Sequence, residues 1–120
     1  MQMKDNVVME KSMEFSVRIV KLYRYLVEEK KEYVMSKQML RSGTSIGANV
    51  REGKYAQSKE DFISKMSIAL KEASETEYWL ELMERTGYLN EEEYESIRKD
   101  SSEISKILTS VVKRAKEKVN

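Results

Sequence analysis

A set of polar side chains recurs at the spacing of one helix face in two neighbouring segments: Arg41, Ser45, Asn49, Glu52, Glu72 and Glu75. Carboxylates gathered inside a helix bundle can hold a metal ion or act as an acid–base pair. A guanidinium beside them suits a third role, because its planar fork pairs with carboxylates where helices meet. The set therefore offers metal binding, acid–base catalysis or a structural polar seam.

Composition favours the structural role. The chain contains no histidine and no cysteine. This excludes the Glu-x-x-His pairs of di-metal bundles and any thiolate chemistry. No nucleophile or cofactor motif accompanies the carboxylates. We predict a structural polar network at a helix–helix or subunit seam, with no catalytic residue, no metal and no cofactor. A carboxylate metal site and a paired-carboxylate active site are the alternatives.

The helix that carries the first four polar residues has an opposite face that is small and apolar: Met39, Gly43, Ile46, Val50 and Gly53. Glycine inside a helix costs about 1 kcal/mol relative to alanine. Glycines kept at that cost indicate that another helix approaches closely on this face.

The elements that position these residues are helices. The chain has 120 residues, of which 40% are hydrophobic and 36% charged, and it contains no proline. That balance favours one all-α domain covering residues 1–120. Apolar periodicity predicts helices at about residues 8–29, 36–56, 59–86 and 91–117, with a frayed end before about Val7. Short connections between them predict an antiparallel up-down-up-down four-helix bundle.

Local signals mark the helix ends. The charge run Glu29 to Glu32 is interpreted as a solvated helix end and turn. Ser36 can cap the second helix, or that helix begins a residue or two earlier. Ser58 and Asn90 each precede acidic residues and predict the starts of the third and fourth helices. Gly87 predicts a left-handed end to the third helix.

A short turn makes the second and third helices antiparallel neighbours. Aligning them about that turn predicts that Arg41 meets Glu72 or Glu75, in its own subunit or across to a neighbour. Asn49 and Glu52 are expected to bond near the start of the third helix.

Two features predict self-association. The first helix has a wide apolar arc, which suits either a helix at the centre of its own bundle or one that also meets another subunit. The third helix has a second stripe beyond its core face, with Ile68, Trp79 and Leu82 as interface candidates. One small bundle cannot easily bury both faces of a helix, and contiguous exposed apolar patches usually mark contacts.

Lys and Arg number 22 and Asp and Glu 21, so the net charge is +1. This balance argues against strong electrostatic attraction to nucleic acid. The candidate nucleic-acid contacts form two modest patches: Arg18, Lys21 and Arg24, and Lys113, Arg114 and Lys116. Three tyrosines, Tyr25, Tyr33 and Tyr55, are candidate stacking partners for unpaired bases. The alternative is that both patches are solvated faces. No apolar run is long enough for a membrane span and no signal peptide is visible, so we expect a cytoplasmic protein with no membrane partner.

The longest motifs resemble a known family. These are Gln38, Arg41–Gly53, Ser58–Phe62, Ile68–Ala73, Glu75–Leu80 and Gly87–Tyr88. They are similar to the signature of the four-helix bundle proteins of the 23S ribosomal RNA intervening-sequence (S23) type. The resemblance implies an antiparallel bundle that assembles as a homopentamer, with RNA binding as the usual proposal. A more distant likeness is to the accessory variability protein of diversity-generating retroelements, a basic pentamer that binds a reverse transcriptase and nucleic acid.

Three hypotheses follow from the residues and the resemblance together. The first is a non-enzymatic oligomeric bundle associated with RNA or a ribonucleoprotein. The second is a protein-interaction scaffold with no nucleic-acid contact. The third, an enzyme, is the least supported.

Overall fold

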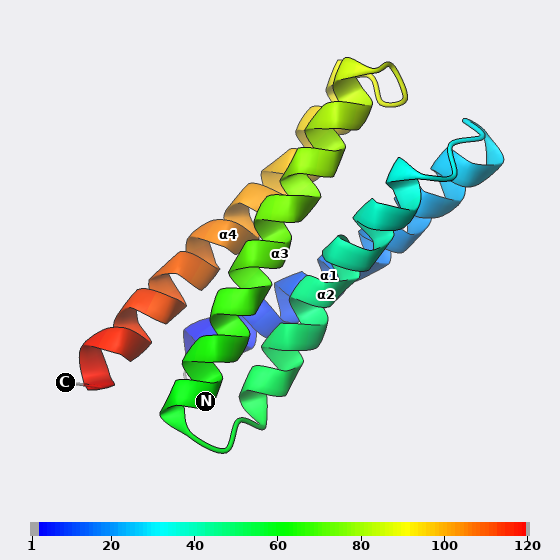
Figure 1. Cartoon of the computed structure of the whole chain (residues 1–120). Coiled ribbons are helices and arrows are strands. Elements are labelled where there is room, and N and C mark those ends of the chain that lie inside the picture. The colour runs from blue at the N-terminus through cyan, green and yellow to red at the C-terminus, as the bar shows by residue number, and fades with distance from the viewer. Residues whose placement is uncertain (1–2, 120) are drawn as a thin grey trace.

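The computed structural model describes the backbone of residues 3–119 and the side chains of residues 5–117. Within these residues the chain forms four helices: α1 (Met3–Glu28), α2 (Met35–Lys54), α3 (Lys59–Arg85) and α4 (Glu91–Val119). Successive helices run in opposite directions, so the predicted all-α antiparallel bundle is confirmed (Figure 1). The bundle is elongated, measuring 49 × 21 × 19 Å along its principal axes. No helix in residues 3–119 is long and apolar enough to cross a lipid bilayer.

The first helix begins earlier than predicted. The sequence indicated a frayed end before about Val7, but α1 already includes Met3; residues 1 and 2 lie outside the described residues. A residue far along the chain stabilises this added turn: the carboxylate of Asp5 accepts a hydrogen bond of 2.9 Å from the Arg114 guanidinium on α4. Val8, in the next turn, is fully buried in the core. Tertiary contacts of this kind override the usual weakness of a chain end.

The turn between α1 and α2 also differs from the prediction. Glu32 is 6% exposed and is not a solvated charge. Its carboxylate accepts hydrogen bonds from the backbone N–H groups of Val34, Met35 and Ser36 at 3.1, 2.9 and 2.7 Å. It therefore satisfies the donors that a helix start leaves free. Ser36 does not cap α2; it lies inside the helix, and its hydroxyl donates to the Glu32 carbonyl at 2.8 Å.

The remaining helix ends follow the predicted local rules. Ser58 caps α3 by accepting from the Asp61 N–H at 3.0 Å. Asn90 and Glu93 bond reciprocally at the start of α4, each side chain accepting from the other's backbone N–H. Gly87, with φ +87°, ends α3 in the left-handed conformation that glycine adopts without strain.

The core extends along the bundle, and α2 packs closely against both of its neighbours. A Cβ atom on Gly43 would lie 2.9 Å from two carbon atoms of Ile19 on α1. A Cβ atom on Gly53 would lie 2.9 Å from the Met66 methyl group on α3. The two glycines therefore let α2 approach both neighbours, which confirms the close packing expected from their cost.

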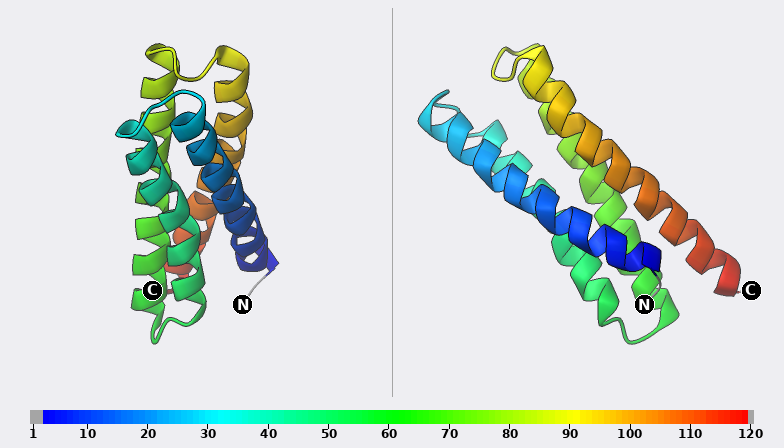
Figure 2. Two further views of the ribbon diagram at one scale, coloured as in Figure 1. Left: turned by 90° about the vertical axis from the view of Figure 1, so that its right-hand side faces the viewer. Right: turned by 180° about the vertical axis from the view of Figure 1, so that it is seen from behind.

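The side of the bundle formed by α1 and α4 is held differently. Three ion pairs cross it, Lys11–Glu103, Arg18–Asp100 and Arg114–Asp5. The end of α1, at the α1–α2 turn, lies apart from the start of α4, at the α3–α4 turn, as the view from behind shows (Figure 2). This open end is the setting of the pocket described below.

Candidate functional sites

Arg41 lies where the helical alignment placed it, but in solvent. Its guanidinium is 3.7 Å from the Glu75 carboxylate on α3, one of the two partners predicted. The side chain of Arg41 is 71% exposed and that of Glu75 is 38% exposed. The Glu75 carboxylate also accepts from the Trp79 indole N–H at 3.3 Å. In a single chain this contact is a surface ion pair.

Arg41, Ser45, Asn49 and Glu52 form one face of α2, which we name the polar column. Its other members either contact α3 or form hydrogen bonds within α2. The Glu52 carboxylate lies 3.6 Å from the Lys65 ammonium near the start of α3, as predicted. Asn49 does not reach α3; its amide donates to the carbonyl of Ser45 at 2.9 Å. Ser45 likewise donates to the carbonyl of Arg41 at 2.6 Å. Short polar side chains in a helix can bond to their own backbone four residues earlier, and both do so here.

A buried polar contact joins α2 and α3 away from the polar column. The hydroxyl groups of Thr76 and Ser42 are 2.9 Å apart, and both residues are fully buried. The sequence analysis did not single out either residue. Ser42 directly precedes Gly43 on the small apolar face, which was the available signal.

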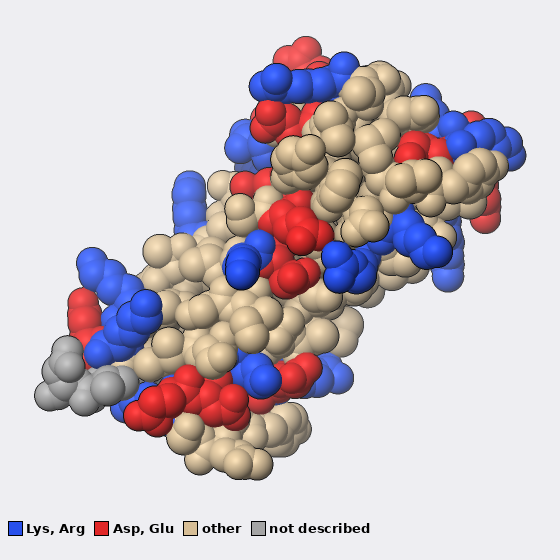
Figure 3. All heavy atoms as spheres, viewed as in Figure 1, with Lys and Arg blue, Asp and Glu red and all other residues tan. Residues whose placement is uncertain are grey.

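The carboxylates of the seam do not gather into a metal centre. Among the described residues, no three acidic side chains lie close enough together to hold a metal ion. Figure 3 shows the face over α2 and α3, where acidic and basic side chains are interspersed with uncharged surface. This face therefore carries no broad region of one sign.

The second stripe of α3 is partly exposed in the single chain. Ile68 is 39% exposed, while Trp79 and Leu82 are half-buried. Next to them, Tyr78 is 59% exposed and its ring meets that of Trp79 edge to face at 5.0 Å. The stripe thus leaves apolar area uncovered beside the Arg41–Glu75 pair.

The candidate nucleic-acid contacts fall into two groups. Arg18 binds Asp100 at 2.6 Å and the hydroxyl of Ser96 at 2.6 Å, so its guanidinium is engaged within the chain. Arg114 is engaged with Asp5. The other four cations are exposed, and no ion pair joins them to a described side chain: Lys21, Arg24, Lys113 and Lys116.

The three candidate stacking tyrosines also differ in exposure. Tyr33 and Tyr55 are 58% and 72% exposed at the two turns that flank α2. Tyr25 is half-buried on α1, and the Lys30 ammonium lies 5.8 Å from the centre of its ring.

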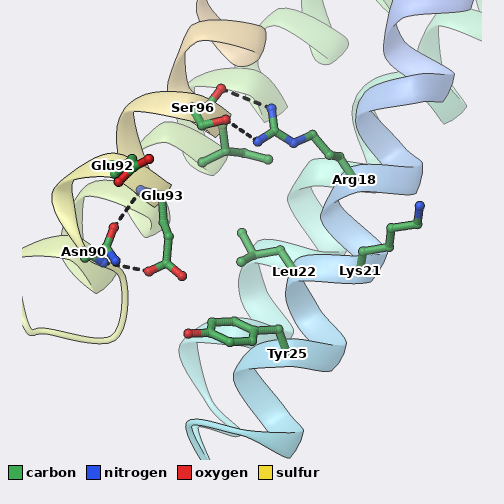
Figure 4. Close-up of a pocket in the computed structure, with 9 residues that line it drawn as sticks. Arg18, Lys21, Leu22, Tyr25, Asn90, Glu92, Glu93 and Ser96 are labelled. Atoms are coloured by element: carbon green, nitrogen blue, oxygen red, sulfur yellow. Dashed lines mark hydrogen bonds between the residues drawn. The ribbon is translucent and has the colours of Figure 1, made fainter.

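A pocket of about 520 Å³ lies between α1 and the first turns of α4. Leu22 and Tyr25 project from α1 toward Asn90 and Glu93, while Lys21 extends away from α4 (Figure 4). The hydrogen bonds from Arg18 to Ser96 bound one end of the pocket. Its volume falls within the range of small-ligand sites.

The pocket brings together an aromatic ring, apolar contacts and polar edge groups. An unpaired base can stack on an aromatic ring and form hydrogen bonds along its edges with amide and carboxylate groups. Tyr25 offers the ring. The Asn90 amide oxygen and one Glu93 carboxylate oxygen already accept backbone N–H groups, so the Asn90 NH₂ group and the other Glu93 oxygen are left for a base edge. Lys21 lies on the outer side, where a phosphate would remain in solvent. Of the sequence-predicted residues, Arg18, Lys21 and Tyr25 meet here; Asn90, Glu93 and Ser96 had no predicted ligand role.

Comparison with known proteins identifies a family and a similar solved structure. The chain matches the family described as 23S rRNA-intervening sequence protein over residues 4–110. It also resembles the crystal structure of a protein of unknown function from the S23 ribosomal protein family of Bacteroides thetaiotaomicron VPI-5482. That structure is 68% identical in sequence and superposes with a TM-score of 0.92, covering 92% of this chain and 99% of the other. The curated proteins contain no match.

Proposed function

Because the chain belongs to the 23S rRNA-intervening sequence protein family, we propose that it acts as a non-enzymatic, homo-oligomeric helical bundle that associates with RNA. One observation carries the RNA part of the proposal. Two uncommitted cations lie one turn apart on α1: Lys21 lines the pocket together with Tyr25, and Arg24 directly precedes Tyr25 in the helix. Phosphate contact and base stacking are thereby supported at the same place.

The strength of such a contact depends on salt. Each phosphate neutralised on a single strand contributes a slope of about −0.7 to the dependence of log affinity on log salt. Two cations per subunit therefore predict a slope of about −1.4 for each subunit engaged. The net charge of +1 supplies little additional long-range attraction.

The test is electrophoretic mobility of labelled ribosomal RNA fragments across a salt series, with an unrelated RNA of equal length for comparison. The variant Lys21→Glu/Arg24→Glu should weaken binding and flatten the salt dependence. A matched control, Lys37→Glu/Lys106→Glu, makes the same change in net charge at two exposed positions that do not line the pocket. The control should bind as the wild type does. Equal weakening in both variants would show that only net charge matters.

Self-association is tested separately. The family resemblance predicts five subunits, and the uncovered apolar area on α3 supports an assembly larger than a monomer. Light scattering at micromolar concentration should give a multiple of 14.1 kDa. The monomer mass would contradict the oligomer, whereas another multiple would contradict only the number five.

A protein-interaction scaffold is the second candidate function. The interspersed charges over α2 and α3 favour it, because a surface without one dominant sign suits a protein partner as well as RNA (Figure 3). Absence of any mobility shift at low salt would favour the scaffold over RNA association.

A further inference from the structure

The outward side of α3 carries a continuous line of large and acidic side chains, which we name the α3 ridge: Ile68, Glu72, Glu75, Trp79 and Leu82. Their spacing places them in one row about 21 Å long. Glu75 is committed to Arg41 and Trp79. The Glu72 carboxylate is half-buried, and no ion pair or side-chain hydrogen bond joins it to another described residue.

The side formed by α1 and α2 carries the opposite shape, a groove of about 330 Å³ that we name the α1–α2 groove. Small residues form much of it, including Ser12, Ser16 and Gly47. A Cβ atom on Gly47 would lie 3.2 Å from the Ser12 carbonyl oxygen, so the two helices pack closely at the groove. Met13, 45% exposed, and Arg51 stand at its edges.

We propose that the α3 ridge of one subunit docks in the α1–α2 groove of a second copy of this chain. The shapes correspond, because large side chains on one surface face small ones on the other. The charges correspond as well, since Arg51 and Glu72 are the uncommitted cation and anion of the two surfaces. An interfacial Arg–Glu pair would fix the register of the contact.

The position of the two surfaces decides the kind of assembly. The ridge lies on the side shared by α2 and α3, where Arg41 meets Glu75, and the groove lies on the adjacent side shared by α1 and α2. The contact therefore joins different patches of the two subunits and is head-to-tail. Head-to-tail contacts between sides that meet at an angle generate a closed ring when the rotation closes. This inference rests on the proposed homo-oligomer and specifies how its subunits meet.

Two lysine substitutions at exposed positions test each surface without disturbing the core. Ile68→Lys places a charge on the ridge, and Ala48→Lys places one in the groove. Because both add positive charge, neither can compensate for the other. Each variant alone should be a folded monomer of 14.1 kDa by light scattering. Tyr55→Lys is the control, since Tyr55 is 72% exposed and belongs to neither surface; it should keep the wild-type mass.

Mixing the two monomeric variants gives the decisive result. The Ile68→Lys subunit retains an intact groove and the Ala48→Lys subunit retains an intact ridge, so a head-to-tail contact allows one native interface. The mixture should therefore form a heterodimer and stop at twice 14.1 kDa. In a separate arm, Arg51→Glu should weaken the assembly, and adding Glu72→Arg to the same chain should restore it.

The other outcomes overturn the proposal in distinguishable ways. Wild-type mass for either lysine variant would mean that its surface is not the interface, while the homo-oligomer itself would stand. Monomeric variants that do not pair on mixing would exclude a head-to-tail contact between these surfaces. A monomeric wild type would remove both this inference and the proposed oligomer. Circular dichroism of every variant establishes that it is folded.

Discussion

The carboxylate of Glu32 gives the sharpest stability prediction in the molecule. It is 6% exposed and accepts three backbone N–H bonds at the start of α2. In Glu32→Gln the amide retains one acceptor oxygen, and its NH₂ group turns a donor toward a backbone donor. At least one charge-assisted hydrogen bond is lost, which costs about 1.5–3 kcal/mol. For a domain of this length that loss corresponds to a fall in Tm of roughly 5–10 °C.

The same residue predicts a pH dependence with a definite sign. Burial would raise the pKa of Glu32, but the hydrogen bonds from Ser36, Met35 and Val34 outweigh it and hold the pKa below its ordinary value. A group whose pKa is lowered on folding contributes stability above its unfolded pKa of about 4.3 and loses it as the pH falls through the folded value. The stability difference between the wild type and Glu32→Gln should therefore narrow below about pH 4.

Thermal unfolding followed by circular dichroism, at one protein concentration and over a pH series, measures both effects. Glu29→Gln is the matched control, because Glu29 is exposed and its side chain lies outside the network. The control should change Tm little at any pH. Equal Tm for the wild type and Glu32→Gln at neutral pH would refute the capping role. A difference that stays constant into acid would show that the carboxylate charge contributes nothing.

Three further predictions concern α2 and the contacts that it makes with α1 and α3. Gly43→Ala should lower stability by about 1–3 kcal/mol in urea unfolding, because its Cβ would overpack against Ile19; a raised midpoint would show that the core yields easily. Arg41→Ala should cost less than about 1 kcal/mol in a monomeric variant, since its ion pair is solvated. A loss of several kcal/mol there would mean that the chain covers Arg41. Thr76→Val should cost about 1 kcal/mol by removing its bond to Ser42, and an unchanged midpoint would contradict that.

The sequence predicted those features that depend on neighbouring residues along the chain. The caps at Ser58 and Asn90 and the left-handed end at Gly87 each need only a local pattern. The small face of α2 was also predictable, because glycine in a helix interior requires a reason in packing.

Glu32 was misread because its role depends on the shape of a turn. The run Glu29 to Glu32 resembles a solvated helix end in composition. Lys31 adopts a φ of 56°, in the left-handed region, and the chain after it folds its N–H groups back onto the Glu32 carboxylate. The pattern of charges does not indicate that the chain reverses here. Non-glycine residues rarely adopt the left-handed conformation, so nothing in the sequence predicts it at Lys31.

The polar column of α2 marks a different limit. Helical spacing assigned Arg41 and Asn49 to one face and predicted Glu72 or Glu75 as the partner of Arg41, of which Glu75 is the one it meets. It could not show that this face is solvated in one chain, because burial depends on what lies opposite. It also could not anticipate that Asn49 bonds to its own helix. The same is true of Asp5 and Arg114, which are 109 residues apart in the chain and meet only through the fold.

The two proposals use different sides of the bundle, and this separation has a consequence. The pocket beside Tyr25 lies between α1 and α4, whereas the ridge and the groove lie on the two sides that contain α2. A ring built through α2 would therefore repeat the pocket and its two free cations in every subunit. One near-neutral subunit offers RNA only a weak contact, but linked sites gain affinity through effective concentration. Monomeric Ile68→Lys should accordingly bind ribosomal RNA more weakly than the wild type, although its pocket is intact. Equal affinity would show that assembly and RNA association are independent.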